Sequence, residues 1–288
     1  MLQFFKLIRV KEYVKNIIVF APLFFSAEML NKSLIIDALI SFVCFCFIAS
    51  SIYILNDLID IEYDKQHPKK KNRPIASGKI SKTFAIVLML VLLISSTSIS
   101  YFVNIELLIV IASYFVLNIL YSLWLKHIAI IDIFIISVGF ILRLLAGAFA
   151  TNIILSDWII LLTLLLSVFL ILGKRRQDVI IFEETKQLIR KSIQRYNKQF
   201  IDNIMVLISS VIISIYIMYS ISADIVLTEY GKYFKLSSLW IILAFLRYFQ
   251  LVFVMNKNKS PIYLFLSDIF LIIVFLLWVL SCLFFIYY

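Results

Sequence analysis

Glycine, proline and cysteine are scarce in this chain of 288 residues, which contains five, four and three of them. Such values exclude collagen-like chains and disordered chains rich in glycine and proline. The three cysteines lie in apolar stretches and match neither a zinc nor a disulfide spacing, so we interpret Cys44, Cys46 and Cys282 as inert buried thiols. The two histidines, His67 and His127, also lack a metal-ligand spacing, and we assign them no catalytic role.

Charged residues are few as well. They make up 15% of the chain, whereas 63% of the residues are hydrophobic and the mean hydropathy is +1.04. Globular domains contain roughly 45–50% apolar residues, so a soluble domain of this size could not bury so much apolar surface. The apolar stretches lack the alternation that is typical of outer-membrane strands, and we therefore predict an all-α polytopic membrane protein.

About nine apolar stretches approach the roughly 20 residues that a helix needs to cross a bilayer. They predict one transmembrane domain over residues 1–288, a helical bundle around a central cavity that opens to the cytoplasmic side. We expect the first stretch to be a span or a partly re-entrant segment bent at Pro22. The stretches are 17–30, 34–55, 83–103, 106–124, 128–150, 157–172, 204–226, 237–255 and 262–287.

The basic residues orient this bundle. If the N-terminus is cytoplasmic, most of the 27 Lys and Arg residues fall on the cytoplasmic side, chiefly before the first span and in loops 56–82 and 173–203. The opposite side keeps Lys32, Lys232 and Lys235. This asymmetry follows the positive-inside rule and predicts an inner-membrane protein of a bacterium with its N-terminus and both long loops in the cytoplasm. Some of the net charge of +10 follows from topology alone, and we expect no nucleic-acid partner.

The first long loop opens with Asn-Asp-Leu-Ile-Asp-Ile-Glu-Tyr-Asp at residues 56–64. On a helix, its four polar residues Asn56, Asp57, Asp60 and Asp64 share one face. Carboxylates packed this closely repel one another unless a cation lies among them, and oxygen ligands suit Mg2+. A solvated acidic helix end is the plain alternative. The metal site is favoured because a basic run with possible phosphate partners follows, namely Lys65, His67, Lys69, Lys70, Lys71 and Arg73.

The second long loop opens with Gly-Lys-Arg-Arg-Gln-Asp at residues 173–178. Its three cations are either topology anchors or phosphate ligands. Asp178 stands three and four residues beyond Arg175 and Lys174, so it can hold one cation while the others bind phosphate. No helical D-x-x-x-D pattern follows, which argues against a second complete metal site, although Asp178 could reach a shared ion.

Arg143 lies well inside the fifth span, with Gly139 and Gly147 one turn to either side. An arginine inside the membrane normally faces a partner or a watery cavity. A structural salt bridge to another helix is one interpretation; we prefer a position that lines the cavity.

Short connections at the cytoplasmic ends of other spans hold further candidates. Lys126 follows the fourth span in a short loop, which suits a phosphate ligand, and Lys15 with Asn16 enters the first span in a similar position. Tyr121 could be an ordinary interfacial aromatic residue. Together these residues predict a cytoplasm-facing, Mg2+-dependent site that suits cleavage of a C–O bond to pyrophosphate, because metal and cations stabilise the leaving group. The residues alone do not decide whether the carbon is allylic or anomeric.

The motif N-D-x-x-D-x-x-x-D at 56–64, followed by Arg-Pro-Ile-Ala-Ser-Gly at 73–78, resembles the UbiA superfamily of intramembrane prenyltransferases. Several stretches are similar to its decaprenyl-phosphate phosphoribosyltransferase branch. They are residues 9–16, Asp64 through His67-Pro68 to Arg73, residues 121–127, Leu142-Arg143, Gly173 to Arg175 with Asp178, and Tyr196.

The resemblance implies a fold of nine spans and transfer of 5-phosphoribose from phosphoribosyl pyrophosphate to a polyprenyl phosphate, a step in lipid-linked pentose synthesis for the cell envelope. Asn56, Asp57, Asp60 and Asp64 would hold Mg2+. The implied catalytic residues are Asp57, Asp60, Asp64, Lys174 and Asp178. The implied substrate-binding residues are Lys15, Asn16, Arg73, Tyr121, Lys126, Arg143, Lys174, Arg175 and Tyr196.

Two alternatives stay open. An aromatic prenyltransferase would use the same metal site with a prenyl diphosphate as donor, to make quinone-type precursors. The single Asp178 departs from the second D-x-x-x-D of such enzymes and favours the sugar phosphate. A transporter of anionic lipids would need broken helices in both halves, whereas only Pro22 and the Gly139/Gly147 pair interrupt the spans.

Overall fold

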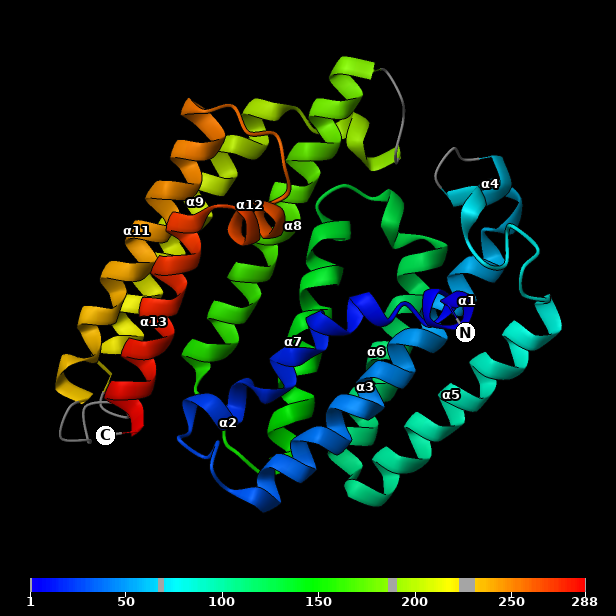
Figure 1. Cartoon of the computed structure of the whole chain (residues 1–288), viewed down its shortest axis with the longest axis horizontal. Helices are drawn as coiled ribbons and strands as arrows, with labels where there is room; N and C mark the ends of the chain where they lie inside the picture. The colour runs from blue at the N-terminus through cyan, green and yellow to red at the C-terminus, as the bar shows by residue number, and fades with distance from the viewer. Residues whose placement is uncertain (1, 67–69, 186–190, 223–230, 288) are drawn as a thin grey trace. The chain divides into compact units, whose positions relative to one another are not determined.

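The computed structural model describes residues 2–66, 70–185, 191–222 and 231–287, and within these residues all regular secondary structure is helical, with no strand (Figure 1). Within them, eight helical segments are long and apolar enough to cross a membrane, which confirms the predicted all-α membrane fold. These segments are Lys32–Ile59, Lys82–Val103, Ile105–Leu123, Ile131–Thr151, Asp157–Thr185, Lys198–Ser220, Gly231–Val254 and Ile269–Tyr287.

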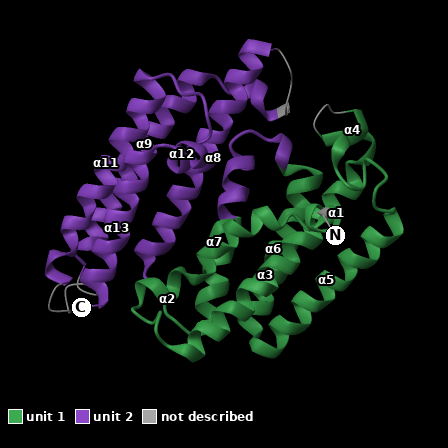
Figure 2. Cartoon of the chain, in the orientation of Figure 1, with its two compact units in different colours: residues 1–125, 139–155 green, residues 126–138, 156–288 purple. Residues whose placement is uncertain are grey.

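The chain divides into two compact units (Figure 2). Unit 1 comprises residues 1–125 and 139–155, and unit 2 comprises residues 126–138 and 156–288. Unit 1 holds α1 (Leu2–Leu7), the 3-10 helix η1 (Val10–Phe20), α2 (Ala21–Phe25), α3 (Lys32–Ile59), α4 (Ile61–Gln66), the 3-10 turn η2 (Lys70–Asn72), α5 (Lys82–Val103), α6 (Ile105–Leu123) and the later part of α7 (Ile131–Thr151).

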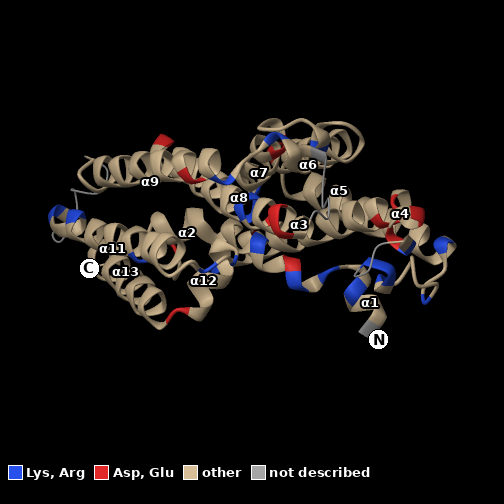
Figure 3. Ribbon diagram, turned by 90° about the horizontal axis from the view of Figure 1, so that it is seen from above, with Lys and Arg blue, Asp and Glu red and all other residues tan. Residues whose placement is uncertain are grey.

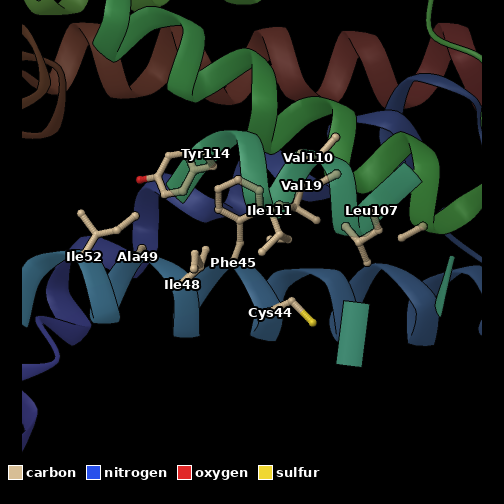
Figure 4. Close-up of a cluster of buried hydrophobic side chains, with 12 residues drawn as sticks. Val19, Cys44, Phe45, Ile48, Ala49, Ile52, Leu107, Val110, Ile111 and Tyr114 are labelled. Atoms are coloured by element: carbon tan, nitrogen blue, oxygen red, sulfur yellow. The ribbon is translucent and has the colours of Figure 1, made fainter. Parts of the chain in front are cut away.

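The core of unit 1 forms where α3 meets α6, η1 and α7. Phe45 and Tyr114 face each other there, with ring centroids 4.8 Å apart, among buried aliphatic side chains (Figure 4). Buried serines join the helices: Ser41 donates to the carbonyl of Ala146 at 3.0 Å, and Ser51 donates to the carbonyl of Met89 at 3.1 Å. Small hydroxyl residues suit such contacts because they let two helices approach closely in an apolar medium.

The first apolar stretch, 17–30, differs from a full span. The 3-10 helix η1 runs to Phe20, and the five-residue helix α2 follows with Pro22 in its first turn. The close approach of η1 to α7 requires a glycine, since a Cβ on Gly147 would lie 1.9 Å from the carbonyl oxygen of Val19. Side-chain contacts also hold η1, because the Tyr13 and Ser50 hydroxyls hydrogen-bond at 2.8 Å.

Unit 2 holds the first part of α7, then α8 (Asp157–Thr185), η4 (Lys191–Arg195), α9 (Lys198–Ser220), η5 (Gly231–Ser237), α11 (Ser238–Phe249), the π-helical turn η6 (Gln250–Val254), α12 (Pro261–Ser267) and α13 (Ile269–Tyr287). The turn η3 (Leu125–His127) lies at the border of the units. Helix α8 packs on α9, and Phe169 of α8 meets Phe245 and Tyr248 of α11 edge-on.

Two boundaries in unit 2 differ from the sequence prediction. Helix α8 continues past the expected span end at 172 to Thr185, and this extension contains the good helix formers Lys174 to Gln177, Glu183 and Glu184. The expected span 262–287 breaks at Asp268, whose carboxylate accepts a hydrogen bond from the Leu271 N–H at 3.2 Å and two from the Arg247 guanidinium. An aspartate that caps a new helix start and pairs with an arginine ends α12 there.

Candidate functional site

The acidic stretch lies where α3 passes into α4. Helix α3 ends at Ile59 and α4 begins at Ile61. The backbone N–H of Asp60 nevertheless donates to the backbone carbonyl of Asn56 at 3.0 Å, and the N–H of Asp64 donates to the carbonyl of Asp60 at 2.8 Å. The helical turn therefore continues through the junction. Asp57 and Asp64 are buried, whereas Asn56 and Asp60 are half-buried. Acidic and basic residues gather around α4 and α1 in Figure 3.

Arg73 joins the two buried carboxylates. Its Nη1 atom lies 3.1 Å from Asp57 Oδ1 and 2.6 Å from Asp64 Oδ2. The turns after η2 present it: Ile75 is buried in a cluster with Ile54 and Ile61, and Gly78 adopts a φ of 72° that favours glycine. The Arg-Pro-Ile-Ala-Ser-Gly motif thus acts as an anchored turn that places one guanidinium between two aspartates.

Each of these carboxylates binds Arg73 through one oxygen only. All described hydrogen bonds of Asp57 fall on Oδ1. Asp64 Oδ1 is buried without a hydrogen bond, 3.9 Å from the ammonium of Lys70. A buried carboxylate oxygen that accepts no hydrogen bond is costly, and such oxygens are typical ligands of hard divalent cations. The donor atoms therefore fit Mg2+, although no group of three or more Asp, Glu, His or Cys side chains is assembled for a metal among the described residues.

Cations surround this acidic site. Arg9, which the sequence analysis did not single out, donates from Nη2 to Asp57 Oδ1 at 2.5 Å. Lys15, predicted to bind substrate, is partly exposed and forms an ion pair with Glu12 one turn away. In the basic run, Lys65, Lys70, Lys71 and Arg73 are described, whereas His67 and Lys69 lie outside the described residues.

Arg143 is buried in the core of unit 1 and binds neutral groups. Its guanidinium donates to Asn16 Oδ1, the Gly139 carbonyl and the Tyr114 hydroxyl, at 2.7, 2.6 and 2.6 Å. It also lies over the rings of Tyr114 and Phe45, 4.8 and 5.3 Å from their centroids. No ion pair involves Arg143 within the described part of the chain, so the salt bridge that we considered is not seen there. The structure does bring together two predicted substrate-binding residues, Arg143 and Asn16.

A second group of predicted residues meets in unit 2. Arg175 is 1% exposed, and its guanidinium lies 2.9 Å from Asp132 Oδ2 and 3.3 Å from Asp178 Oδ2. The expected pairing of Asp178 with one cation of this loop is therefore present. Arg176 is buried too and pairs with Asp202 at 2.6 Å, whereas Lys174 is exposed.

Tyr196 belongs to the same network. Its hydroxyl donates to Asp132 Oδ1 at 3.1 Å and accepts from the N–H of Ile130 at 2.5 Å. Burial raises the pKa of Tyr196 to about 12, and the Asp132 carboxylate adds to the shift, so the phenol is protonated at neutral pH. Ile130 has a φ of 71°, a strained conformation for a β-branched residue, just before α7.

Two predicted residues remain. Tyr121, near the end of α6 in unit 1, and Lys126, in η3 at the start of unit 2, are both partly buried. Sequence reasoning missed Asp132 and Tyr114 as partners of buried arginines. For Asp132 a signal existed, because an acid next to an apolar span needs a cation to be buried.

A family model described as the UbiA prenyltransferase family matches residues 17–269. The chain belongs to this family. Among curated relatives, the UbiA-family protein named decaprenyl-phosphate phosphoribosyltransferase from Corynebacterium glutamicum is 35% identical over 84% of this chain and 74% of its own length. The protein of that name from Mycobacterium tuberculosis is 31% identical over 84% of this chain and 81% of its own. The resemblance to this branch is thereby confirmed.

Solved structures of the family show the same fold. A UbiA homolog from Archaeoglobus fulgidus bound to DMAPP and Mg2+ superposes with a TM-score of 0.70 at 15% identity and covers 99% of each chain. A digeranylgeranylglyceryl phosphate synthase structure has a TM-score of 0.64 at 22% identity, over 99% of this chain and 98% of that one. At such identities these structures support the fold alone. The family match and the curated relatives identify the chain as a multi-pass membrane transferase of the UbiA family.

Proposed function

We propose that this chain transfers 5-phosphoribose from phosphoribosyl pyrophosphate to a polyprenyl phosphate and releases pyrophosphate. The observation that carries the proposal is the likeness to proteins named decaprenyl-phosphate phosphoribosyltransferase, which extends over 84% of the chain. The buried acidic site with its basic neighbours supports it, because the donor presents a diphosphate. The length of the lipid is left open.

In this reaction an oxygen of the lipid phosphate forms a bond to C1 of the ribose. The bond from C1 to the pyrophosphate oxygen breaks, and the pyrophosphate leaves with the electron pair. We assign Asn56, Asp57, Asp60 and Asp64 as the residues that would hold Mg2+ on the diphosphate. When bound there, the metal neutralises charge that develops on the leaving group. The acceptor phosphate is already anionic, so it needs little help from a general base.

The cations have separate proposed tasks. Arg73 would meet the diphosphate beside the two carboxylates, with Lys15 as a further ligand from η1. Lys126, Lys174 and Tyr121 are proposed substrate-binding residues of the other predicted stretches. Arg143 and Asn16 would meet the lipid phosphate or a sugar oxygen. For Arg175 and Tyr196 the buried contacts with Asp132 favour a role in holding Asp178 and the residues after η4 in place.

We propose further that both units act as one domain, with the site on the cytoplasmic side of a bacterial inner membrane. The family match across residues 17–269 supports a single domain, and the basic loops support the orientation. Phosphoribosyl pyrophosphate is a charged, water-soluble donor, and the site must open to the compartment that supplies it.

Incubation of the purified protein with labelled phosphoribosyl pyrophosphate, undecaprenyl or decaprenyl phosphate and Mg2+ tests the function. We expect a labelled lipid, which fails to form without the lipid phosphate or with a chelator. A prenyl-diphosphate-dependent aromatic prenyltransferase is the second candidate, favoured by the fold neighbours bound to DMAPP and to GPP. Turnover of a prenyl diphosphate with an aromatic acid, with no labelled lipid, would replace the first proposal by the second.

A further inference from the structure

Arg9 reaches the acidic site from the N-terminal end of η1. Its Nη2 atom lies 2.5 Å from Asp57 Oδ1, the same oxygen that Arg73 contacts at 3.1 Å. Its guanidinium also lies over the ring of Tyr53, 4.7 Å from the centroid. Two arginines from distant parts of unit 1 thus converge on one buried carboxylate.

The backbone of Arg9 is adapted to this contact. It has φ 52° and ψ 51°, the left-handed conformation, and stands at the N-cap of η1. This conformation is unfavourable for residues other than glycine and persists only where the surrounding structure holds it. Here the burial of Leu7 and the hydrogen bond from the Glu12 N–H to the Arg9 carbonyl hold the turn.

Charge balance gives Arg9 a task that Arg73 cannot fulfil alone. Asp57 and Asp64 carry two negative charges, and both are buried. Arg73 is shared between the two carboxylates, and Lys70 lies near Asp64. Without Arg9, Asp57 would therefore keep only the cation that it shares with Asp64, and a buried carboxylate that lacks a cation is strongly destabilised. If Arg73 binds the diphosphate, as in the proposed function, Arg9 is the cation that stays on Asp57.

We propose that Arg9 is a positioning residue of the acidic site: it holds Asp57 through Oδ1 and so presents Oδ2 to the cation of the diphosphate donor. This proposal rests on the proposed function in requiring a metal-bound diphosphate, but it does not depend on whether the diphosphate belongs to a sugar or to a prenyl chain. The stacking on Tyr53 restricts the guanidinium to one orientation, which an ammonium group could not reproduce.

The test compares Arg9→Gln and Arg9→Lys with the control Lys11→Gln, an exposed cation two residues away. Binding of Mn2+ is measured by electron paramagnetic resonance in the presence of the donor diphosphate, and kcat and KM are measured for donor and lipid. Residues that orient a metal ligand typically contribute 10–100-fold to metal affinity or activity. We expect Arg9→Gln to weaken Mn2+ binding by about 10-fold or more and to lower kcat, with the KM for the lipid unchanged.

Arg9→Lys keeps the charge and serves as the second variant if Arg9→Gln does not fold. We expect several-fold weaker Mn2+ binding for it, and wild-type binding for Lys11→Gln. Wild-type Mn2+ binding in a folded Arg9→Gln or Arg9→Lys protein would overturn the proposal. If the wild type turns over a prenyl diphosphate instead of phosphoribosyl pyrophosphate, the proposed function fails, while the metal-binding comparison still decides the role of Arg9.

Discussion

The pair formed by Asp64 and Arg73 allows a separation of structural from catalytic effects. Asp64 is 1% exposed and Arg73 is 26% exposed, with 2.6 Å between Oδ2 and Nη1. Loss of one partner of a buried ion pair costs roughly 3–5 kcal/mol, and the partial exposure of Arg73 argues for the lower end. We therefore expect Arg73→Gln to lower the free energy of unfolding by about 3 kcal/mol, because it leaves Asp64 buried beside Lys70 only.

Asp64→Asn should be milder. The amide oxygen still accepts a hydrogen bond from Arg73, so the loss is the difference between a charged and a neutral hydrogen bond, about 1 kcal/mol. In the double variant the second substitution removes the uncompensated carboxylate. We expect the double variant to be more stable than Arg73→Gln alone, with a coupling energy of about 2 kcal/mol between the two positions.

Activity should follow a different pattern from stability. If Asp64 is a metal ligand, the single and double variants should all lose at least the roughly 100-fold that outer partners of metal ligands can contribute. Stability is measured by SDS titration of the detergent-solubilised protein, and activity by transfer of labelled ribose phosphate to lipid. Asp37→Asn, in the same helix α3 and outside the acidic stretch, is the matched control. Additive stability losses, or activity that returns in the double variant, would refute the reasoning.

Two further predictions concern the stability of each unit. Gly147→Ala should lower the free energy of unfolding by about 3 kcal/mol, because the new Cβ meets the backbone of Val19; Gly139→Ala, whose Cβ has only contacts at 3.4 Å, should cost clearly less by the same titration. The raised pKa of Tyr196 means that its contribution to stability is fully present below pH 10 and is lost as the pH rises toward 12. Thermal unfolding across this range should show the loss in the wild type and not in Tyr196→Phe, and equal pH profiles would contradict it.

The membrane fold was predictable because only helices and closed barrels satisfy the backbone in a bilayer, and the apolar stretches lack the alternation that barrel strands show. The ends of the helices were harder to predict, because each end depends on a single tertiary contact. In the sequence, Asp268 is a polar residue inside an apolar run, and only its pairing with Arg247 and its hydrogen bond from the Leu271 N–H make it a break between helices. Likewise, the close approach of Gly147 to Val19 in η1 is a tertiary contact that no local pattern contains.

The acidic site was predictable in its residue types and only partly in its geometry. Helical spacing placed four oxygen-bearing side chains on one face, and the structure keeps the backbone turn that this requires. Helical spacing does not determine how deeply each of these side chains is buried. Asp57 and Asp64 are buried and pair with Arg73, whereas Asn56 and Asp60 are half-buried. Arg9 escaped notice because its sequence distance from Asp57 carries no periodic signal.

Cations that bind substrate and cations that balance internal charge look alike in a sequence. Lys174, Arg175 and Arg176 are consecutive, yet the two arginines turn inward to Asp132 and Asp202 and only the lysine is exposed. A helix separates consecutive side chains by about 100°, so three adjacent cations cannot all face one ligand. The spacing alone limits such a run to one or two phosphate contacts. The cations that pair with Asp132 and Asp202 are the ones that do not face a substrate. By this reasoning we propose Lys174, rather than Arg175 or Arg176, as the phosphate ligand of this run.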